Sequence, residues 1–597
     1  MDAGVDARPP QLQAANLSAA PDGDPPPSSS PDSPLEIDHM PVDGMDMNFN
    51  EDEPITVAVL QEPEESAVES YTVMFIPEAE DTIDEPALKI IRTEDVADAD
   101  VGRRESLGRR PSSRVKHLRE LGLHVNTTEA ELPPGVVDVP PEEILPEIEW
   151  VPESYEHTAK VLVEKFNAVF LESGDENAVT QYAGHLIAKD HMDSNFYVCD
   201  IGCVFRLYQA WREALPRVRP FYAVKCMPDR GLVSTLAALG AGFDCATAHE
   251  IELAMQCGAG ANRIIFAHPQ KMPREIKAAR AKGAHLTTFD TATELRKIAQ
   301  HDPDAKLVLR IRADDPSAKC QLGNKYGAEE HDWEQLFATA ARNGQKVVGV
   351  SFHVGSNAAD TNAYARAVQQ ADKAFKMAAA HGFGSSMKLL DIGGGFQAKF
   401  REDGSVDMSW AEVVRDAIDE WFPPERGVKI IAEPGRFFAE APFAIATTVY
   451  GRRVRKLPSG GQAMDYWITD GIYGSMNCLL YDHADLKPAV LKNPLEDIVK
   501  SPSGDVRPAQ PVATRALYPT TLFGPTCDGA DKVVEGMMMP ELNEGDWVLF
   551  FKFGAYTLAG AVNFNGFQVD QDAMHVHYIF SLEPGETPQG VAAGDEV

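Results

Sequence analysis

A lysine in an apolar and aromatic run is the first residue whose type and place could do chemistry. Lys225 stands in PFYAVKC (220–226), at the end of a short stretch of strand-forming residues. Apolar neighbours disfavour a charged ammonium, so we expect the pKa of Lys225 to lie below its ordinary value. A neutral amine is a nucleophile, so the run predicts a reactive lysine. The alternative is a surface lysine at a strand terminus.

Two glycine-containing turns further along the chain are typical of a phosphate site. DIGGGF (391–396) has three consecutive glycines after a predicted strand, and AEPGRF (432–437) has a Gly-Arg pair after the next one. Glycine lets backbone N–H groups approach a phosphate closely. Glu433 adds a carboxylate at the same place, and its alternative role is that of a salt-bridged rim residue.

The elements that must position these residues alternate between short apolar strands and amphipathic helices. Such alternation gives a parallel sheet, and eight units over about 220 residues predict a (β/α)8 barrel. The two glycine turns then follow strands seven and eight, whose loops often hold phosphate in such barrels. The eight predicted strands are 220–225, 242–246, 263–268, 286–290, 306–311, 347–355, 388–395 and 429–435.

The polar residues of these units gather at one end of the predicted barrel. Catalytic residues of such barrels lie at the C-terminal ends of the strands, and a structural core does not need so many charged groups there. The residues at or just past a strand's C-terminal end are Lys225, Asp244, His268, Asp290, Arg310, His353, Gly393, Gly394, Gly395 and Glu433.

The rest of the chain divides into an acidic leader and a second folded region. Residues 1–150 hold 34 acidic and 10 basic residues and 19 of the 42 prolines, a composition that predicts disorder. Within the leader, 103–119 is basic and offers Ser106 and Ser112 as kinase sites. The alternative for 103–119 is a solvated basic stretch.

The folded body is predicted to begin near Trp150 with a helix at 155–172. The barrel is expected over 200–442. Residues 155–199 and 443–590 are expected to form a β domain, because runs after 443 alternate without long helices. Within this domain, 484–516 is Pro-rich and polar and is predicted to be a surface loop.

The composition excludes several functional classes. The net charge of −36 disfavours general nucleic-acid binding, which needs clustered Lys and Arg. The N-terminus lacks a basic segment followed by an apolar run, and no apolar stretch of about 18 residues predicts a membrane span. Eight scattered cysteines without a CxxC pair disfavour a zinc ribbon or a disulfide framework. We therefore expect a cytoplasmic protein.

Ten motifs in series resemble the eukaryotic, fungal-type ornithine decarboxylases over about residues 155–585. The resemblance implies an alanine-racemase-like (β/α)8 barrel with a C-terminal β domain, pyridoxal 5′-phosphate as cofactor, and a head-to-tail homodimer. The motifs are PFYAVKC, FDCATAHE (243–250), VLRI (308–311), SFHVGSN (351–357), DIGGGF, AEPGRF, GIYGSMNCLLYDH (471–483), GPTCDGAD (524–531), GDW (545–547) and GAYTLAGAVNFNGF (554–567).

The same resemblance implies a role for each matched residue at the cofactor. Lys225 would form the Schiff base, His353 would stack on the pyridine ring, and Glu433 would pair with the ring nitrogen. Asp244 and Glu250 would support the lysine and the cofactor, with Arg310 as a polar neighbour. The phosphate would be held by Ser356, Gly393, Gly394, Gly395, Arg436 and Tyr556.

The substrate site is implied to draw on both subunits. Tyr473 and Asp482 would line it, with Asp482 taking the distal ammonium. Cys527 and Asp528 would come from the partner subunit, and Cys527 would protonate the former α-carbon. Lys325 and Asp531 would pair across the dimer interface.

The reaction implied is the conversion of L-ornithine to putrescine and carbon dioxide, the first step of polyamine biosynthesis. Cys-Asp-Gly at 527–529 favours a diamine-forming enzyme over the diaminopimelate decarboxylases, which usually show Cys-Glu-Ser. A lysine or dual lysine/ornithine decarboxylase is an alternative, because one methylene contributes only about 1–3 kcal/mol of discrimination. A non-catalytic relative resembling the antizyme inhibitors is another, and a barrel-only pyridoxal-phosphate homeostasis protein does not explain the β domain.

A regulatory partner is also implied by the resemblance. In the animal family a basic segment of the barrel binds antizyme. The matching stretch is about 262–285, and the alternative for it is a solvated helix face. Its basic residues are Arg263, Lys271, Arg274, Lys277, Arg280 and Lys282.

Overall fold

The computed structural model describes residues 153–190, 192–313, 323–356, 360–491, 515–567 and 575–582. In the leader it describes the backbone of β1 (Tyr71–Met74) and β2 (Lys89–Arg92), which pair antiparallel. The remainder of the leader, with Ser106 and Ser112, lies outside the described residues. Its predicted disorder and its kinase sites therefore stay predictions.

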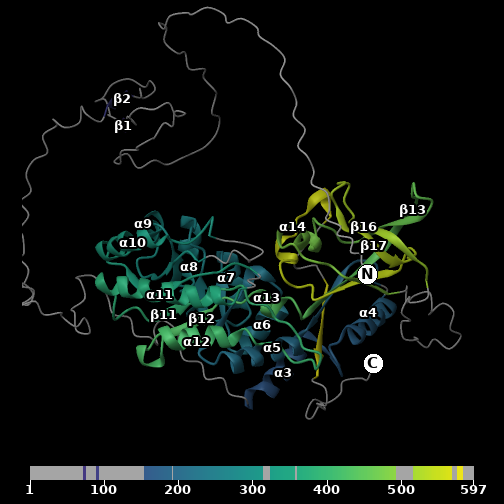
Figure 1. Ribbon diagram of the computed structural model, residues 1–597, viewed down its shortest axis with the longest axis horizontal. Coiled ribbons are helices and arrows are strands. Elements are labelled where there is room, and N and C mark those ends of the chain that lie inside the picture. The colour runs from purple at the N-terminus through teal and green to yellow at the C-terminus, as the bar shows by residue number, and fades with distance from the viewer. Residues whose placement is uncertain are drawn as a thin grey trace, which may run out of the picture. The chain divides into compact units, whose positions relative to one another are not determined.

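Eight parallel strands, β5 to β12, form a closed barrel in chain order (Figure 1). β12 pairs with β5, from Ile430↔Val218 to Ala432↔Pro220, and this pairing closes the ring. The predicted (β/α)8 barrel is confirmed. The strands are β5 (Val218–Ala223), β6 (Gly242–Cys245), β7 (Ile264–Phe266), β8 (Leu286–Phe289), β9 (Lys306–Arg310), β10 (Lys346–Ser351), β11 (Leu389–Asp391) and β12 (Lys429–Ala432).

Helices follow or precede these strands and cover the barrel. Their first turns are capped where the sequence places Asp or Thr: Asp229 accepts from the Leu232 N–H, and Thr247 and Thr291 cap in the same way. The helices are α5 (Ile201–Ala214), α6 (Arg230–Ala238), α7 (Ala248–Gln256), α8 (Pro273–Ala281), α9 (Ala292–His301), α10 (Glu330–Arg342), α11 (Asn362–Ala380), α12 (Ala411–Trp421) and the short α13 (Arg436–Ala439).

A separate apolar cluster fills the barrel interior, with one buried residue from each strand except β6. On β6 a Cβ atom at Gly242 would lie 2.6 Å from the ring of Phe221, so the Phe221 ring takes the space of the missing side chain. The interior is therefore a packed core that closes the barrel below the polar strand ends. Its members are Phe221, Ile265, Leu286, Val308, Val348, Leu389 and Ile431.

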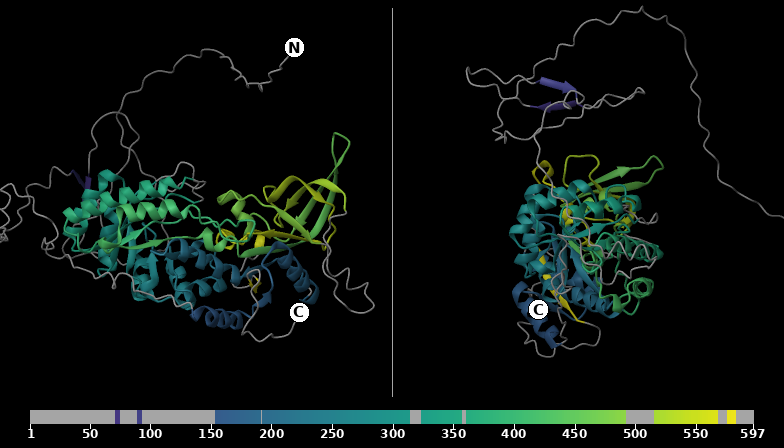
Figure 2. Two further views of the ribbon diagram at one scale, coloured as in Figure 1. Left: turned by 60° about the horizontal axis from the view of Figure 1, so that its bottom comes forward. Right: turned by 90° about the vertical axis from the view of Figure 1, so that its left-hand side faces the viewer.

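The second folded region is a sheet with the strand order β17-β16-β14-β13-β4-β19-β3, to which β18 and β15 add through β13. β3 and β4 come from before the barrel in sequence, so this sheet joins both flanks of the barrel. The hairpin of β13 and β14 extends away from the barrel helices (Figures 1 and 2). The strands are β3 (Val169–Leu171), β4 (Phe196–Asp200), β13 (Phe443–Lys456), β14 (Gln462–Ile468), β15 (Pro488–Leu491), β16 (Leu517–Phe523), β17 (Lys532–Pro540), β18 (Trp547–Phe551) and β19 (Val576–Ser581).

The bounds of four predicted elements are wrong. The predicted helix 155–172 is α3 (Glu153–Phe166), which ends because Asn167 takes a left-handed conformation, φ 50°, and the chain then enters β3. The predicted loop 484–516 contains β15, which pairs with β18, while 492–514 lie outside the described residues. The predicted strands 347–355 and 388–395 end early, because their last residues form the loops of the candidate site.

Two further helices complete the described part of the β domain. α4 (Glu176–Asp190) lies between β3 and β4, and α14 (Cys478–Tyr481) follows β14. No helix among the described residues is long and apolar enough to cross a membrane.

Candidate active site

Lys225 lies in a turn just past β5, at the C-terminal end of the barrel. The turn is a 3₁₀ helix, Val224–Cys226, and it directs the Lys225 ammonium toward the end of β6, where Nζ lies 2.5 Å from Asp244 Oδ2. Burial lowers the pKa of Lys225, but Asp244 and Glu433 raise it by more, so it lies above its ordinary value. The expected lowered pKa is wrong for this state, because the sequence does not show that carboxylates of later strands face the lysine.

Three buried carboxyl groups belong to the cluster around Lys225, whose own side chain is 43% exposed. Asp244, Asp391 and Glu433 are 1%, 0% and 7% exposed. Burial, with Asp391 and Asp244 nearby, raises the pKa of Glu433 well above its ordinary value. Burial also raises the pKa of Asp391 to about 7, although its hydrogen bonds to Glu433 and the Gly393 N–H oppose the rise. Asp391 and Glu433 therefore keep one proton between them near neutral pH.

His353 follows β10 and is present as a neutral imidazole. Its desolvation, with Arg310 and Lys225 nearby, holds its pKa well below the ordinary value. Nδ1 accepts a hydrogen bond of 3.0 Å from the Gly355 N–H, so the proton of the neutral ring lies on Nε2. Arg310, at the end of β9, lies over the ring of Tyr326 at 5.2 Å.

The three glycines of DIGGGF form a tight loop between His353 and Glu433. Gly393 and Gly395 have φ of 66° and 102°, and Gly394 has no room for a side chain. A Cβ atom at Gly394 would lie 2.6 Å from the Glu433 carbonyl oxygen and 2.9 Å from His353 Nε2. The loop is thus held by the same two residues that face Lys225.

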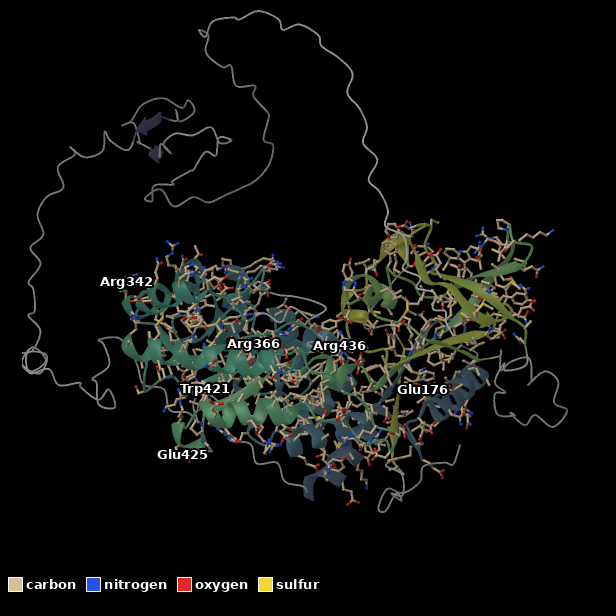
Figure 3. All side chains as sticks on the ribbon, in the orientation of Figure 1. Glu176, Arg342, Arg366, Trp421, Glu425 and Arg436 are labelled. Carbon is tan, nitrogen blue, oxygen red and sulfur yellow. The ribbon has the colours of Figure 1, made fainter. Side chains whose placement is uncertain are left out.

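Arg436 lies at the start of α13, where the barrel ribbon meets the β domain (Figure 3). Its guanidinium donates to both carboxylate oxygens of Asp482 and, over 2.9 Å, to Glu440. Burial lowers the pKa of Arg436, but these carboxylates raise it above its ordinary value. Tyr556 lies beside the same group, with its ring 5.4 Å from the guanidinium carbon. The predicted phosphate ligand and the predicted ammonium ligand are therefore in direct contact.

Glu250 lies near Lys225 on the first turn of α7. One of its carboxylate oxygens accepts from the Ala246 N–H at 2.5 Å. Burial raises its pKa, and the Ala246 N–H and Lys225 oppose that rise. The structure thus brings together the barrel residues predicted around Lys225, together with Arg436, Tyr556 and Asp482.

A second group of predicted residues gathers within the β domain. The Tyr473 hydroxyl donates to Asp528 Oδ2, and the Tyr473 ring stacks on Phe564 with centroids 4.2 Å apart. The hydrogen bond from the Ala530 N–H, followed by that of Tyr473, lowers the pKa of Asp528. Cys527 is exposed, and its N–H donates to Asn565. These hydrogen bonds all have both partners in the β domain, and none of them reaches the residues around Lys225.

For three predicted residues the described contacts do not test the predicted role. Lys325 lies with its Nζ 5.3 Å from the ring centre of Tyr326. Asp531 is buried and accepts from the Ile472 and Thr526 N–H groups within its own chain. Ser356 is the last described residue before 357–359, which lie outside the described part of the chain. Their predicted roles stay predictions.

Comparisons with known proteins agree on one family. The family model described as pyridoxal-dependent decarboxylase, pyridoxal binding domain, matches residues 201–440. Ornithine decarboxylase of Mus musculus is 40% identical over 435 residues, which cover 70% of this chain and 88% of the relative. The chain belongs to the ornithine decarboxylase family. Chloroplastic ornithine decarboxylase of Nicotiana glauca is 43% identical over 386 residues, 64% of this chain and 84% of the relative.

Solved structures of similar decarboxylases share the fold. The arginine decarboxylase of Paramecium bursaria Chlorella virus bound to agmatine is 37% identical, with a TM-score of 0.60, and covers 68% of this chain and 100% of its own. The lysine/ornithine decarboxylase of Vibrio vulnificus complexed with putrescine is 28% identical, with a TM-score of 0.56, over 69% and 99% of the two chains. By family the chain is thus a pyridoxal-phosphate-dependent decarboxylase. The names of its relatives specify different amino acids: ornithine, arginine and lysine/ornithine.

The residues of the site fit pyridoxal phosphate. The aldehyde requires a lysine, which Lys225 supplies, and the ring nitrogen requires a carboxyl group that can share a proton, which Glu433 supplies. The phosphate requires cations and close backbone approach, which Arg436 and the glycine loop supply. Among the described residues of the site, three buried polar atoms lack a hydrogen-bond partner: Asp244 Oδ1, Asp391 Oδ2 and Arg436 Nε. Each can still bind a polar group.

Four residues of this region were not singled out by the sequence reasoning. Asp391 stands in the motif DIGGGF, directly before the glycines, and its place at a strand end was a usable signal. Phe564 stands in NFNGF, an aromatic run in a predicted turn. No sequence signal marked Tyr326 as the partner of Arg310, or Asn477 as a link between loops, because both contacts join distant segments.

Proposed function

We propose that this chain is an ornithine decarboxylase that converts L-ornithine to putrescine and carbon dioxide and thereby begins polyamine synthesis. The observation that carries the proposal is the cluster around Lys225, in which the lysine, Asp244, Glu433 and the glycine loop occupy one end of the barrel. Membership of the ornithine decarboxylase family supports the same substrate.

The roles of the barrel residues follow from their contacts. Pyridoxal phosphate would be held by Lys225, Arg436, Tyr556 and Gly393–Gly395. The neutral imidazole of His353 would lie against its ring. When bound, the cofactor supplies an electron-accepting ring that takes up the electron pair left on Cα when the carboxylate departs. Glu433 and Asp391 keep a proton at the buried end, where it favours that acceptance. Asp244 would hold the Lys225 amine in place beside the cofactor through their 2.5 Å contact.

The substrate's distal ammonium would be recognised by carboxylates. Asp482 is 6% exposed and is held by Arg436, while Asp528 carries the Tyr473 hydrogen bond. A substrate without the distal ammonium would lack these ion pairs and would bind more weakly. The Cys527 thiol would place the proton on Cα that completes the diamine.

Each active site would draw on two copies of the chain. We call the group of Tyr473, Cys527 and Asp528 the wall. The hydrogen bonds described for this group have both partners in the β domain. Apolar residues beside the wall are exposed and would be covered by a partner. Tyr481 is 71% exposed and Phe564 40% exposed. A head-to-tail homodimer with two-fold symmetry would set this wall over the Lys225 group of the partner.

Subunit mixing tests the shared site. Lys225→Ala and Cys527→Ala are each expected to be nearly inactive. After exchange half of the dimers are heterodimers, each with one site that carries both lesions and one that carries neither, so about a quarter of native activity returns. Activity that stays flat after confirmed exchange contradicts the shared site and leaves the decarboxylase assignment intact.

The substrate is tested by product analysis. Purified protein, with and without added pyridoxal phosphate, is offered L-ornithine, L-lysine and L-arginine, and the amine products are separated. We expect putrescine as the main product, with a preference over lysine on the order of ten- to two-hundredfold for one methylene. Cadaverine in equal amount indicates a dual lysine/ornithine enzyme, agmatine an arginine decarboxylase, and no amine at all a non-catalytic relative.

Antizyme binding and a cytoplasmic location are further proposals from the family resemblance. Within the basic segment, Lys271 is buried against Glu294 and Lys282 pairs with Glu252, so the segment offers less free charge than its sequence suggests. Arg274 and Lys277 on α8 are both exposed. Charge reversal of these two residues is expected to abolish any inhibition by antizyme, and cell fractionation tests the location.

A further inference from the structure

Asn477 joins two loops of the β domain that are far apart in sequence. It ends the 3₁₀ turn Ser475–Asn477, directly before α14 (Figure 1), and only 2% of it is exposed. Its Nδ2 donates to the Gly474 carbonyl and, 80 residues away, to the Thr557 carbonyl, both over 2.6 Å. One buried amide thus connects the loop 470–477 with the loop 554–560.

One of these loops leads to the proposed cofactor pocket, and the other leads to the wall. Thr557 follows Tyr556, whose N–H donates over 2.8 Å to the carbonyl of Cys226, the residue next to Lys225. Gly474 follows Tyr473, which binds Asp528 and stacks on Phe564. A continuous path of covalent and hydrogen bonds therefore runs from Lys225 through Asn477 to the wall that contains Cys527.

The surroundings make this link rigid. Asp470 Oδ1 accepts from the Gly471 and Ser475 N–H groups at 2.7 and 2.8 Å, so one carboxylate oxygen holds both ends of the Tyr473 turn. The Tyr473 carbonyl accepts from the Val562 N–H at 2.8 Å. On the other side a Cβ atom at Gly560 would collide with Asn477 Oδ1. The amide therefore has a single fitted position.

We propose that Asn477 is a positioning residue for both active sites of the dimer. Through Thr557 and Tyr556, Asn477 positions the cofactor pocket of its own subunit. Through Gly474 and Tyr473, it positions the wall that its subunit contributes to the partner's site. This inference rests on the proposed shared site. Loss of the Asn477 amide removes a buried hydrogen bond between the two loops. The cofactor pocket and the wall are then both held less precisely.

The test places Asn477→Ala on one side of a single working site. In the mixture of Lys225→Ala and Cys527→Ala subunits, the working site takes its wall from the first subunit and its cofactor pocket from the second. Asn477→Ala in the Lys225→Ala subunit is expected to raise the KM for ornithine about tenfold with little change in cofactor affinity. The same change in the Cys527→Ala subunit is expected to weaken pyridoxal phosphate binding about tenfold.

A second readout does not depend on turnover. The absorbance of bound pyridoxal phosphate, titrated into the Cys527→Ala homodimer with and without Asn477→Ala, gives the cofactor affinity directly. Gln345→Ala is the matched control, because Gln345 is also a buried amide that donates to a backbone carbonyl, that of Leu295, but precedes β10 at the opposite end of the barrel. It should change neither parameter.

Each outcome decides between the possibilities. If the parent mixture recovers a quarter of native activity and Asn477→Ala behaves like Gln345→Ala in both placements, the inference is wrong and the shared site stands. If only one placement has an effect, Asn477 serves one half alone and the inference is also wrong. If the parent mixture recovers nothing, the shared site fails and the inference with it. Should Asn477→Ala not fold, Gly560→Ala displaces the same amide and must give the same pair of effects.

Discussion

Replacing Glu433 by glutamine should stabilise the cofactor-free protein while it removes activity. Because the pKa of Glu433 is raised well above its ordinary value of 4.5, the folded protein keeps a proton on this side chain that the unfolded chain releases. Glutamine needs no such proton. Between an ordinary carboxyl pKa and pH 8 this cost reaches about 5 kcal/mol as a ceiling, at about 1.36 kcal/mol per unit. Relaxation and water access reduce this ceiling, so we expect a gain of about 1–3 kcal/mol for Glu433→Gln.

The sign of the pH dependence follows from the raised pKa. Between the ordinary carboxyl pKa and about 7, the folded protein binds more protons than the unfolded chain. The free energy of unfolding of the native protein therefore falls as the pH rises through this range. In Glu433→Gln the amide donates permanently to Asp391, so this fall should be weaker, and the two proteins should converge toward pH 4–5. Turnover with saturating cofactor should drop on the order of a hundredfold or more, because the proton at the buried end is no longer shared.

Urea unfolding of the cofactor-free protein, from pH 4.5 to 8.5 at one fixed protein concentration, measures the effect. The control is Glu294→Gln. Glu294 is also fully buried, but its Oε1 lies 2.8 Å from Nζ of the buried Lys271, so its loss leaves an unpaired charge and should destabilise by about 3–5 kcal/mol. If Glu433→Gln destabilises the protein to the same extent at pH 5 and pH 8, the reasoning about the shared proton is refuted.

Three further predictions concern the glycine loop, the lysine and the leader. Gly394→Ala should weaken pyridoxal phosphate binding about tenfold or more in an absorbance titration, because its Cβ would press on Glu433 and His353; Gly461→Ala, whose Cβ would meet no atom closer than 3.8 Å, should leave binding unchanged. Asp244→Asn should shift the reaction of Lys225 with amine-directed reagents in cofactor-free protein to lower pH, read by mass spectrometry, since the ion pair raises the lysine's pKa. A shift to higher pH would show that Asp244 is not the dominant partner. Deletion of residues 1–145 should leave turnover nearly unchanged and lengthen cellular half-life; a large loss of turnover in a soluble truncated dimer would contradict the first part, and an unchanged half-life the second.

The sequence by itself determined the architecture of the barrel and the neighbourhood of the lysine. Strands of three to six residues alternate with amphipathic helices, and parallel strands expose their C-terminal ends on one face. That rule is local and repetitive, so the order of residues along the chain is enough to place Lys225, Asp244, His353 and Glu433 at one end of the barrel. The motifs in series then pointed to the family, because each holds several residues at fixed spacing.

The tertiary structure alone decided the protonation of the site and the pairing of its residues. The apolar run PFYAVKC predicted a lowered lysine pKa, yet Asp244 and Glu433 approach from other strands and raise it. Arg436 and Asp482 are 46 residues apart and form an ion pair. Asn477 reaches Thr557 only because the two loops fold together. Electrostatic and hydrogen-bond energies depend on the distances between atoms in space, and sequence separation does not contain those distances.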